Sequence, residues 1–179
     1  MSGFRHLGDT VLHSGPVVTL CRSEFSSPDG DQFVREVVRH PGAVSVVPLL
    51  EDRTVVLVRQ YRGAVDQMVL EIPAGKRDVA GEPLEDTARR ELIEEVGLAA
   101  GRLELLVRFH NSIGFTDEES HVFLGTELTP APMDRQGIEE SHMEVVHVAL
   151  DDTPAMIASG EITDAKTVIG LTLAVARTR

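Results

Sequence analysis

The sequence predicts an α/β fold in which helices cover both faces of a mixed β-sheet, with a small β-unit ahead of it. Three features favour this class. Ala43 to Leu50 and Thr54 to Arg59 are short apolar runs of the kind that form strands buried on both faces. Two helical segments, one ending near Leu98 and one beginning at Asp164, are interspersed with further strand-like runs. A break at Pro41-Gly42 separates this region from the β-rich residues before it.

Length and charge limit the class of protein. A chain of 179 residues is long enough for one domain with a sizeable core, and no second independent domain is expected. The formal net charge of −12 argues against a protein that binds nucleic acid or an anionic membrane unaided, because phosphate attraction needs clustered Lys and Arg. An acidic protein that acts on a phosphate ester therefore needs a metal ion to mediate the contact.

The sequence carries no signal for export or for a membrane span. Cys21 is the single cysteine, which excludes an intramolecular disulfide. The opening residues MSGFRHLGDT hold no apolar signal segment. No apolar run approaches the ~20 residues that cross a bilayer. We expect a cytoplasmic protein.

Residues 1–40 are predicted to form a separate β-unit ahead of a main domain over residues 41–179. Two strand-like runs, Val17 to Cys21 and Phe33 to Val38, are joined by the turn sequence Ser27-Pro28-Asp29-Gly30. A small hairpin by itself is marginally stable in water. This unit must therefore pack on its own domain or on a partner subunit.

The strand that begins at Thr54 ends in polar and charged residues. Arg59-Gln60-Tyr61-Arg62 follows an apolar run, which indicates that the chain leaves the core there. Arg62 therefore lies at the rim of the domain, where an ion pair is one role open to it. Arg35 in the β-unit is most simply read as a solvent-exposed strand arginine. Met68 to Ile72 then forms the next strand.

The stretch from Glu71 to Leu98 carries the strongest chemical signal, since it combines a strand end, a Gly-rich loop and an acidic helix. On a helix, Glu91 and Glu95 lie about 40° apart, with Glu94 on their flank. Like charges at this spacing weaken a helix by roughly 0.2–0.5 kcal/mol per pair. A hard divalent cation such as Mg²⁺ would relieve the crowding, because its preferred ligands are oxygens. The alternative is a solvated helix face that neighbouring arginines neutralise.

The remaining elements complete the α/β pattern. Strands are expected at Leu103–Phe109, His121–Leu124 and Glu144–Leu150, with a Pro-rich, acidic loop over residues 129–140. Thr163 is the expected N-cap of the final helix. These elements supply the rest of the sheet and its second covering helix.

The Gly-rich loop and the acidic helix together resemble the signature box of the Nudix hydrolases. The positions that match its defining residue types are Gly75, Glu82, Arg90, Glu91, Leu92, Glu94, Glu95, Gly97 and Leu98. Six residues separate Gly75 from Glu82, one more than the signature usually has, and this extension is similar to that of many ADP-ribose pyrophosphatases. The resemblance implies a Nudix-type α/β/α sandwich around a mixed β-sheet.

The resemblance also implies roles for the residues of the box. The implied metal ligands are Glu91, Glu94, Glu95 and the backbone carbonyl of Ala74. Glu94 is shared between metals or lies behind the other two glutamates. The residues implied to be structural are Gly75, Glu82, Arg90 and Gly97. Among them, Glu82 and Arg90 would form a salt bridge that fixes the loop on the helix.

The general base is expected outside the box, because the box carboxylates are mostly bound to metal. The acidic loop that follows Phe109 is the source we expect, since ADP-ribose pyrophosphatases carry a loop glutamate there. Glu118 stands at that position, and Glu119 is the alternative. This chain departs from the subgroup at Ile113, where a proline is usual.

The resemblance implies substrate contacts and a partner as well. The resemblance implies that Arg62 contacts a phosphate or ribose of the substrate, and Glu71 and Arg35 are candidate substrate contacts as well. In ADP-ribose pyrophosphatases an N-terminal β-unit is commonly exchanged between the two subunits of a dimer. We therefore expect a homodimer in which residues 1–40 pack on the other subunit.

The sequence thus predicts an enzyme that hydrolyses the diphosphate linkage of a nucleoside diphosphate sugar, with ADP-ribose giving AMP and ribose 5-phosphate. The expected cofactor is Mg²⁺, with Mn²⁺ as the alternative. Two other functions stay open: a Nudix hydrolase of another nucleotide sugar such as GDP-mannose, and a non-catalytic module that senses ADP-ribose. The intact box and the lack of a basic helix favour the enzyme.

Overall fold

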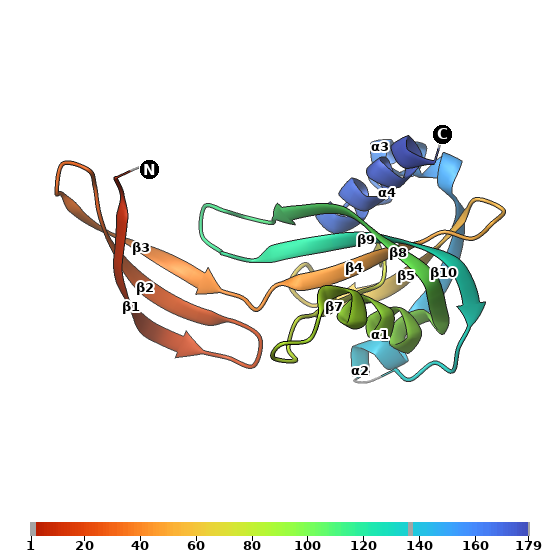
Figure 1. Cartoon of the computed structure of the whole chain (residues 1–179), viewed down its shortest axis with the longest axis horizontal. Helices are drawn as coiled ribbons and strands as arrows, with labels where there is room; N and C mark the ends of the chain where they lie inside the picture. The colour runs from red at the N-terminus through yellow and green to blue at the C-terminus, as the bar shows by residue number, and fades with distance from the viewer. Residues whose placement is uncertain (1–2, 136–137, 179) are drawn as a thin grey trace. The chain divides into compact units, whose positions relative to one another are not determined.

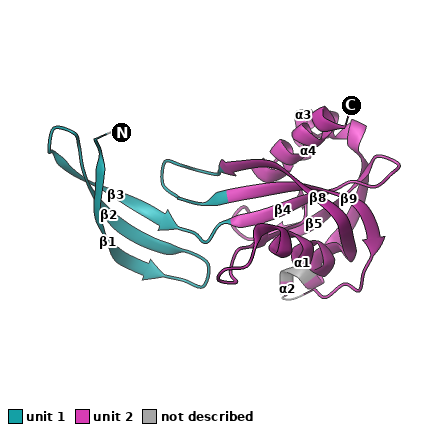
Figure 2. Ribbon diagram, in the orientation of Figure 1, with its two compact units in different colours: residues 1–42, 110–119 teal, residues 43–109, 120–179 magenta. Residues whose placement is uncertain are grey.

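The computed structural model describes residues 3–135 and 138–178, and the chain forms two compact units. Unit 1 comprises residues 1–42 and 110–119, and unit 2 comprises residues 43–109 and 120–179 (Figure 2). Unit 1 therefore combines the N-terminal strands with a loop that lies far along the chain.

Unit 1 is built on a three-stranded antiparallel sheet in the order β1-β2-β3. Its strands are β1 (Arg5–Ser14), β2 (Thr19–Ser26) and β3 (Gln32–Arg39). The predicted turn between β2 and β3 is present: Gly30 has a φ of 93°, and the N–H of Ser27 donates to the carbonyl of Asp31 at 2.8 Å. The sequence predicts two strands here, and the structure adds β1. Every residue of β1 is exposed, so burial imposes no apolar alternation on it.

Unit 2 contains two sheets. One is antiparallel in the order β10-β5-β6, and the other has the order β7-β4-β9-β8. In the second sheet β4 runs parallel to β9 and antiparallel to β7, so this sheet is mixed. The strands are β4 (Ala43–Pro48), β5 (Thr54–Arg62), β6 (Gln67–Glu71), β7 (Ala74–Lys76), β8 (Leu98–His110), β9 (Glu119–Pro130) and β10 (Glu144–Ala149).

The helices of unit 2 are α1 (Leu84–Val96), α2 (Ile138–Ser141), α3 (Thr153–Ser159) and α4 (Ala165–Arg177), with a 3-10 turn at Leu150–Asp152. The prediction that Thr163 caps the last helix is wrong. Asp164 is the N-cap, because its carboxylate accepts a hydrogen bond from the N–H of Thr167 at 3.0 Å. None of the helices in the described ranges has the length and apolar character needed to cross a bilayer.

Part of the segment predicted as a loop over residues 129–140 lies outside the described residues, at 136–137. Around it, β9 extends to Pro130 and α2 begins at Ile138. The remaining predicted strands are present. Most differ from the expected bounds by one to three residues at either end, but β8 and β9 are much longer than expected.

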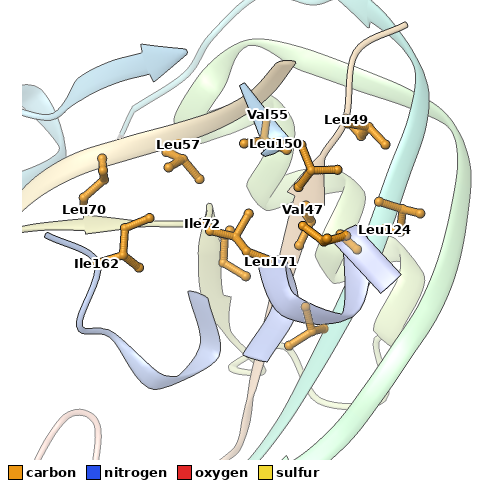
Figure 3. Packing of buried hydrophobic residues seen from close by; sticks show 13 residues of the cluster. Val47, Leu49, Val55, Leu57, Leu70, Ile72, Leu124, Leu150, Ile162 and Leu171 are labelled. Carbon is orange, nitrogen blue, oxygen red and sulfur yellow. The ribbon is translucent and has the colours of Figure 1, made fainter. Parts of the chain in front are cut away.

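Side chains of β5 alternate between two cores, which gives unit 2 its layers. Val56 packs in a cluster with Leu92 of α1, whereas Leu57 packs in a cluster with Leu171 of α4 (Figure 3). Helix α1 therefore covers one side of the strands, and α3 and α4 cover the other (Figure 1). All four side chains are fully buried, and each such burial contributes about 1.5–3 kcal/mol. The predicted α/β/α layering is confirmed.

Candidate active site

Glycine ends the acidic helix at its C-terminus. Gly97 has a φ of 66°, and its N–H donates to the carbonyl of Ile93 at 3.0 Å. A Cβ at this position would lie 3.1 Å from the carbonyl oxygen of Ala131. The position needs glycine for its left-handed backbone and for the close approach of the neighbouring chain.

The first glycine of the box lies directly against a helix carboxylate. A Cβ on Gly75 would stand 1.9 Å from Cδ of Glu91 and 2.0 Å from its Oε1. A glycine therefore lets the backbone of β7 approach the carboxylate closely. The loop therefore packs closely on the helix at Gly75.

Arg90 forms hydrogen bonds with three carboxylates of the box. Its Nη1 donates to Glu91 at 2.8 Å and to Glu94 at 3.2 Å. Its other side contacts Glu82, with Nη2 at 3.3 Å and Nε at 3.4 Å. The hydrogen bond from Arg90, with another from Thr87 at 2.8 Å, lowers the pKa of Glu82 below its usual range. One arginine thus shares its charge among three glutamates.

Glu91 has a raised pKa although it accepts a hydrogen bond from Arg90. Burial raises the pKa of Glu91 to about 7; the charge of Arg90 opposes this rise, and the charge of nearby Glu94 adds to it. A buried carboxylate with a raised pKa gains most from a further positive charge close by. The electrostatics of the box therefore favour the addition of a cation.

Glu95 is held by a different set of contacts. Its side chain is buried, and its Oε2 accepts a hydrogen bond from the N–H of Ala74 at 2.9 Å. Arg135 donates to the backbone carbonyl of Glu95 at 3.2 Å and to the carbonyl of Met143 at 2.7 Å. These contacts fix the last turn of α1 from both sides.

Glu91, Glu94 and Glu95 of α1 do not share one centre. Within residues 3–135 and 138–178, no three acidic, His or Cys side chains are grouped so as to hold a metal ion. Glu91 and Glu94 turn to Arg90, whereas Glu95 turns to Ala74. Their oxygens nevertheless form a donor set of the kind that hard divalent ions prefer. The charge imbalance at Glu91 makes this donor set fit such an ion.

A second polar network lies at the end of β6. Glu71 is almost fully buried, and Arg62 donates to both of its oxygens, at 2.6 Å and 2.7 Å. Lys166 also contacts Glu71 and pairs with Asp164 at 3.0 Å. Burial works against the charged form, but the Arg62 hydrogen bonds and the charges of Lys166 and Arg62 outweigh it, so the pKa of Glu71 lies below its ordinary value. This carboxylate is ionised and fully paired.

The same network joins β6 to α4. The N–H of Ile72 donates to Oγ1 of Thr167 at 2.9 Å, and that hydroxyl donates to Asp164 at 2.6 Å. The N-cap of α4 is therefore part of the structure that holds Arg62 in place.

A model of the NUDIX domain matches residues 39–168 of the chain. The chain belongs to the NUDIX domain family. It is 40% identical to an ADP-ribose pyrophosphatase of Bacillus subtilis (strain 168), over 87% of this chain and 84% of the relative. It is 35% identical to an ADP-ribose pyrophosphatase of Mycobacterium tuberculosis (strain ATCC 25618 / H37Rv), over 94% of this chain and 81% of the relative. The predicted membership of the Nudix hydrolases is confirmed.

Two further comparisons are with a differently named relative and with a solved structure. A GDP-mannose pyrophosphatase of Citrobacter koseri (strain ATCC BAA-895 / CDC 4225-83 / SGSC4696) is 33% identical over 82% of this chain and 81% of the relative. The crystal structure of an ADP compounds hydrolase has a TM-score of 0.83 and covers 97% of this chain and 93% of that chain. Its sequence identity is 22%, so this match supports the Nudix fold alone.

Two of the predicted site residues of this Nudix chain belong to unit 1. Arg35 lies on β3, where its guanidinium stacks 4.9 Å from the ring centroid of Phe33 and donates to the carbonyl of Val34 at 2.8 Å. Glu118 lies in the loop 110–119, with Oε1 at 3.8 Å from Nδ1 of His40. Its neighbour Glu119 begins β9.

Three residues of these Nudix networks were missed by sequence reasoning. Lys166 stands in an apolar stripe that reads as ordinary helix packing, and its partner Glu71 is remote in sequence. Arg135 lies in a segment with no repeated pattern, so no local signal points to its contact with α1. Asp164 was the detectable residue, since an Asp before a helical segment is a common N-cap.

Proposed function

We propose that this Nudix chain hydrolyses the diphosphate linkage of a nucleoside diphosphate sugar, and that ADP-ribose, giving AMP and ribose 5-phosphate, is its preferred substrate. The observation that supports this proposal most is the close approach of Gly75 to Glu91, which sets a half-buried, crowded carboxylate beside the loop backbone. The relatives named ADP-ribose pyrophosphatase support the choice of substrate.

Glu91, Glu94, Glu95 and the carbonyl of Ala74 would hold a divalent cation, Mg²⁺ first and Mn²⁺ as the alternative. When bound, such a cation stabilises charge on phosphoryl oxygens and lowers the pKa of bound water. Arg90 keeps Glu91 and Glu94 together, and Glu82 holds Arg90 from the other side. In the reaction a water oxygen forms a bond to phosphorus, and the bond to the bridging oxygen breaks.

Glu118 is the proposed general base that takes the proton from the attacking water. We expect Glu118→Gln to lower turnover by roughly 10²–10⁴, the range for loss of a general base, with little change in substrate affinity. Glu119→Gln is the matched control and should cost much less. If Glu119→Gln is the more damaged enzyme, or if neither variant loses more than a few-fold, a box carboxylate must activate the water.

Arg62 is the proposed contact to a substrate phosphate or ribose, and Glu71 serves that contact by orienting Arg62. The exposed side of the Arg62 guanidinium supports this role, because the side chain is 43% exposed while the side chain of Glu71 is 2% exposed. Arg35 is a second proposed contact, from unit 1. Arg62→Lys should raise KM, since lysine cannot make the paired hydrogen bonds of a guanidinium.

A panel of nucleotide sugars tests the substrate assignment. The enzyme is incubated with Mg²⁺ and ADP-ribose, GDP-mannose or other nucleoside diphosphate sugars, and phosphate is measured after phosphatase treatment. Highest kcat/KM for ADP-ribose supports the proposal. Highest kcat/KM for GDP-mannose would favour the second candidate, which the GDP-mannose pyrophosphatase relative supports. Glu95→Gln in the same assay controls for contaminating activity.

We propose a homodimer in which the β-unit of each chain packs on the other subunit. The apolar side chains exposed on this unit support the proposal, among them Phe4, Leu7, Val11 and Leu12, which are 47–58% exposed. Sedimentation should show a dimer at micromolar concentration, and Val11→Lys should weaken it. Ile138→Lys changes an exposed apolar residue of unit 2 and is the control. A monomeric wild-type protein would overturn the dimer.

The remaining partners follow from charge. From the net charge of −12 we propose that the protein acts on a small-molecule substrate and binds neither nucleic acid nor a membrane. We propose the cytoplasm as its location. Weak, salt-independent retention on heparin and on anionic vesicles is the expected result.

A further inference from the structure

We propose that Arg39 is a positioning residue for the reaction: it ties the Glu118 loop to the N-terminal strands, so that the proposed base is held by unit 1. This inference rests on the proposed role of Glu118. It assigns a function in catalysis to the N-terminal sheet.

Backbone hydrogen bonds first join the loop to the end of β3. The N–H of Val38 donates to the carbonyl of Phe115 at 2.7 Å, and the N–H of Asp117 donates back to the carbonyl of Val38 at 3.3 Å. Val38 and Thr116 accordingly form a parallel β-bridge. The loop is therefore an additional short partner of β3, although more than 70 residues separate the two in sequence.

Asp117 is then gripped through both of its carboxylate oxygens. Its Oδ1 accepts from the N–H of His40 at 2.9 Å, and its Oδ2 accepts from Nη1 of Arg39 at 3.1 Å. Asp117 directly precedes Glu118, whose own N–H donates to Oγ1 of Thr116 at 3.2 Å. The chain direction at Glu118 is thus set by contacts on the two residues before it.

Arg39 has a second anchor on the opposite edge of the sheet. Its Nη2 and Nε hold Asp9 of β1 through both oxygens, at 2.9 to 3.2 Å. A hydrogen bond from Ser23, with others from His6 and Arg39, lowers the pKa of Asp9 to about 2, so its charge is present at neutral pH. Because these contacts are bidentate and networked, they exceed an ordinary exposed ion pair.

One guanidinium therefore connects β1, β3 and the loop. Such a connection makes the loop move with the sheet, since neither can shift without breaking charged hydrogen bonds. Misplacing a catalytic group by about 1 Å can cost 10²-fold in rate. Loss of Arg39 should accordingly lower kcat and leave substrate binding nearly unchanged.

Three variants test the inference in the full-length chain with ADP-ribose and Mg²⁺. Arg39→Gln should lower kcat about tenfold with KM within a few-fold, which is below the loss from a fully misplaced group. Arg39→Lys, which keeps the charge, should recover part of the loss. Arg22→Gln removes another arginine of the same sheet, one that pairs only loosely with Glu24 at 3.6 Å, and is the control expected to keep wild-type turnover.

Hydrogen exchange supplies a readout that does not depend on activity. In Arg39→Gln, the amides of Val38, His40 and Asp117 should exchange faster, and those of β2 should be unchanged. In a Glu118→Gln background, Arg39→Gln should have little further effect on kcat, because both changes act on one group. Wild-type exchange rates in Arg39→Gln would show that Arg39 does not hold the Glu118 loop on the N-terminal strands. Faster exchange with wild-type kcat would overturn the positioning role.

The two proposals fail separately. Wild-type turnover in Glu118→Gln rejects Glu118 as the base and with it the catalytic role of Arg39. A large loss in Glu118→Gln with none in Arg39→Gln keeps the base and rejects Arg39 alone.

Discussion

Two largely buried glutamates of unit 2 have pKa shifts of opposite sign. Glu71 is paired by Arg62 and Lys166, and its pKa is lowered. Glu91 shares a single arginine with its neighbours, and burial raises its pKa to about 7. The side chain of Glu71 is 2% exposed and that of Glu91 is 13% exposed, so much of the difference comes from the number of cations that each one meets.

The charges around Glu71 are fully paired, whereas the carboxylates around Glu91 outnumber the cations. Around Glu71, every charge has a partner within hydrogen-bond reach, so the network can fix Arg62 without further ligands. Around Glu91, one positive charge serves several carboxylates, so a bound cation would lower the free energy of the folded protein. We infer that the first network positions residues and that the second binds a ligand.

The largest expected effect comes from removing one of the proposed metal-binding carboxylates of α1. Glu95→Gln keeps the side-chain shape, and its amide oxygen can still accept from the N–H of Ala74. We expect turnover to fall at least about a hundredfold while the fold stays intact. Without metal the variant should melt no lower than wild type, since charge repulsion is relieved.

Steady-state kinetics in saturating Mg²⁺ measure this loss, and circular dichroism checks the fold. Glu85→Gln, an exposed glutamate in the first turn of α1, is the control and should behave as wild type. Near-normal turnover in Glu95→Gln would remove the metal-site assignment.

Removing a cation from the Glu71 network should instead lower the free energy of unfolding. Lys166→Met retains most of the packing volume but takes one cation from buried Glu71 and from Asp164. Loss of a partner from a buried charged group costs about 1–3 kcal/mol of unfolding free energy. Urea unfolding at neutral pH measures it.

A matched change on the same helix provides the reference. Arg177→Met removes an exposed ion pair with Glu104, and such pairs contribute about 0–1 kcal/mol. Equal destabilisation by the two changes would mean that Lys166 is an ordinary surface cation.

Local spacing explains why the box could be predicted from the sequence. Gly75, Arg90 and the helix glutamates are close in the chain, and a helix brings residues four apart onto one side. The strands of unit 2 were equally readable, because their apolar runs are buried on both faces, as in Val55 to Val58.

Long-range pairing explains most of what could not be predicted. Lys166 reaches Glu71 across 95 residues, and Arg39 reaches Asp117 across 78. Neither pairing leaves a local pattern. Thr163 and Asp164 are both good N-cap residues, and the choice between them depends on which carboxylate or hydroxyl meets the N–H of Thr167.

A smaller effect should come from moving Glu91 without changing it. In Gly75→Ala the new Cβ would overlap the Glu91 carboxylate, so that flexible side chain must shift. Because a side-chain end can move cheaply, stability should change by less than about 1 kcal/mol. Turnover should fall about tenfold, since a displaced ligand is worth less than a removed one.

The control is Gly75→Ala in a Glu91→Gln background, where it should cause little further loss of turnover. Additive losses would show that Gly75 acts through the backbone and not through Glu91.

The smallest expected effect is a difference in acid sensitivity. The folded pKa of Glu71 lies below its ordinary value of 4.5, so its contribution to stability is full above that pH and declines as the pH falls further. Asp164 acts in the same direction, since its pKa is also lowered despite burial.

Lys166→Met removes a cause of both shifts. The gap in unfolding free energy between wild type and Lys166→Met should therefore be largest near neutral pH and should narrow between pH values of about 5 and 3. Urea titrations at several pH values measure the gap. A gap that stays constant with pH would mean that Lys166 stabilises the fold by packing and that Glu71 draws its charge balance from Arg62 alone.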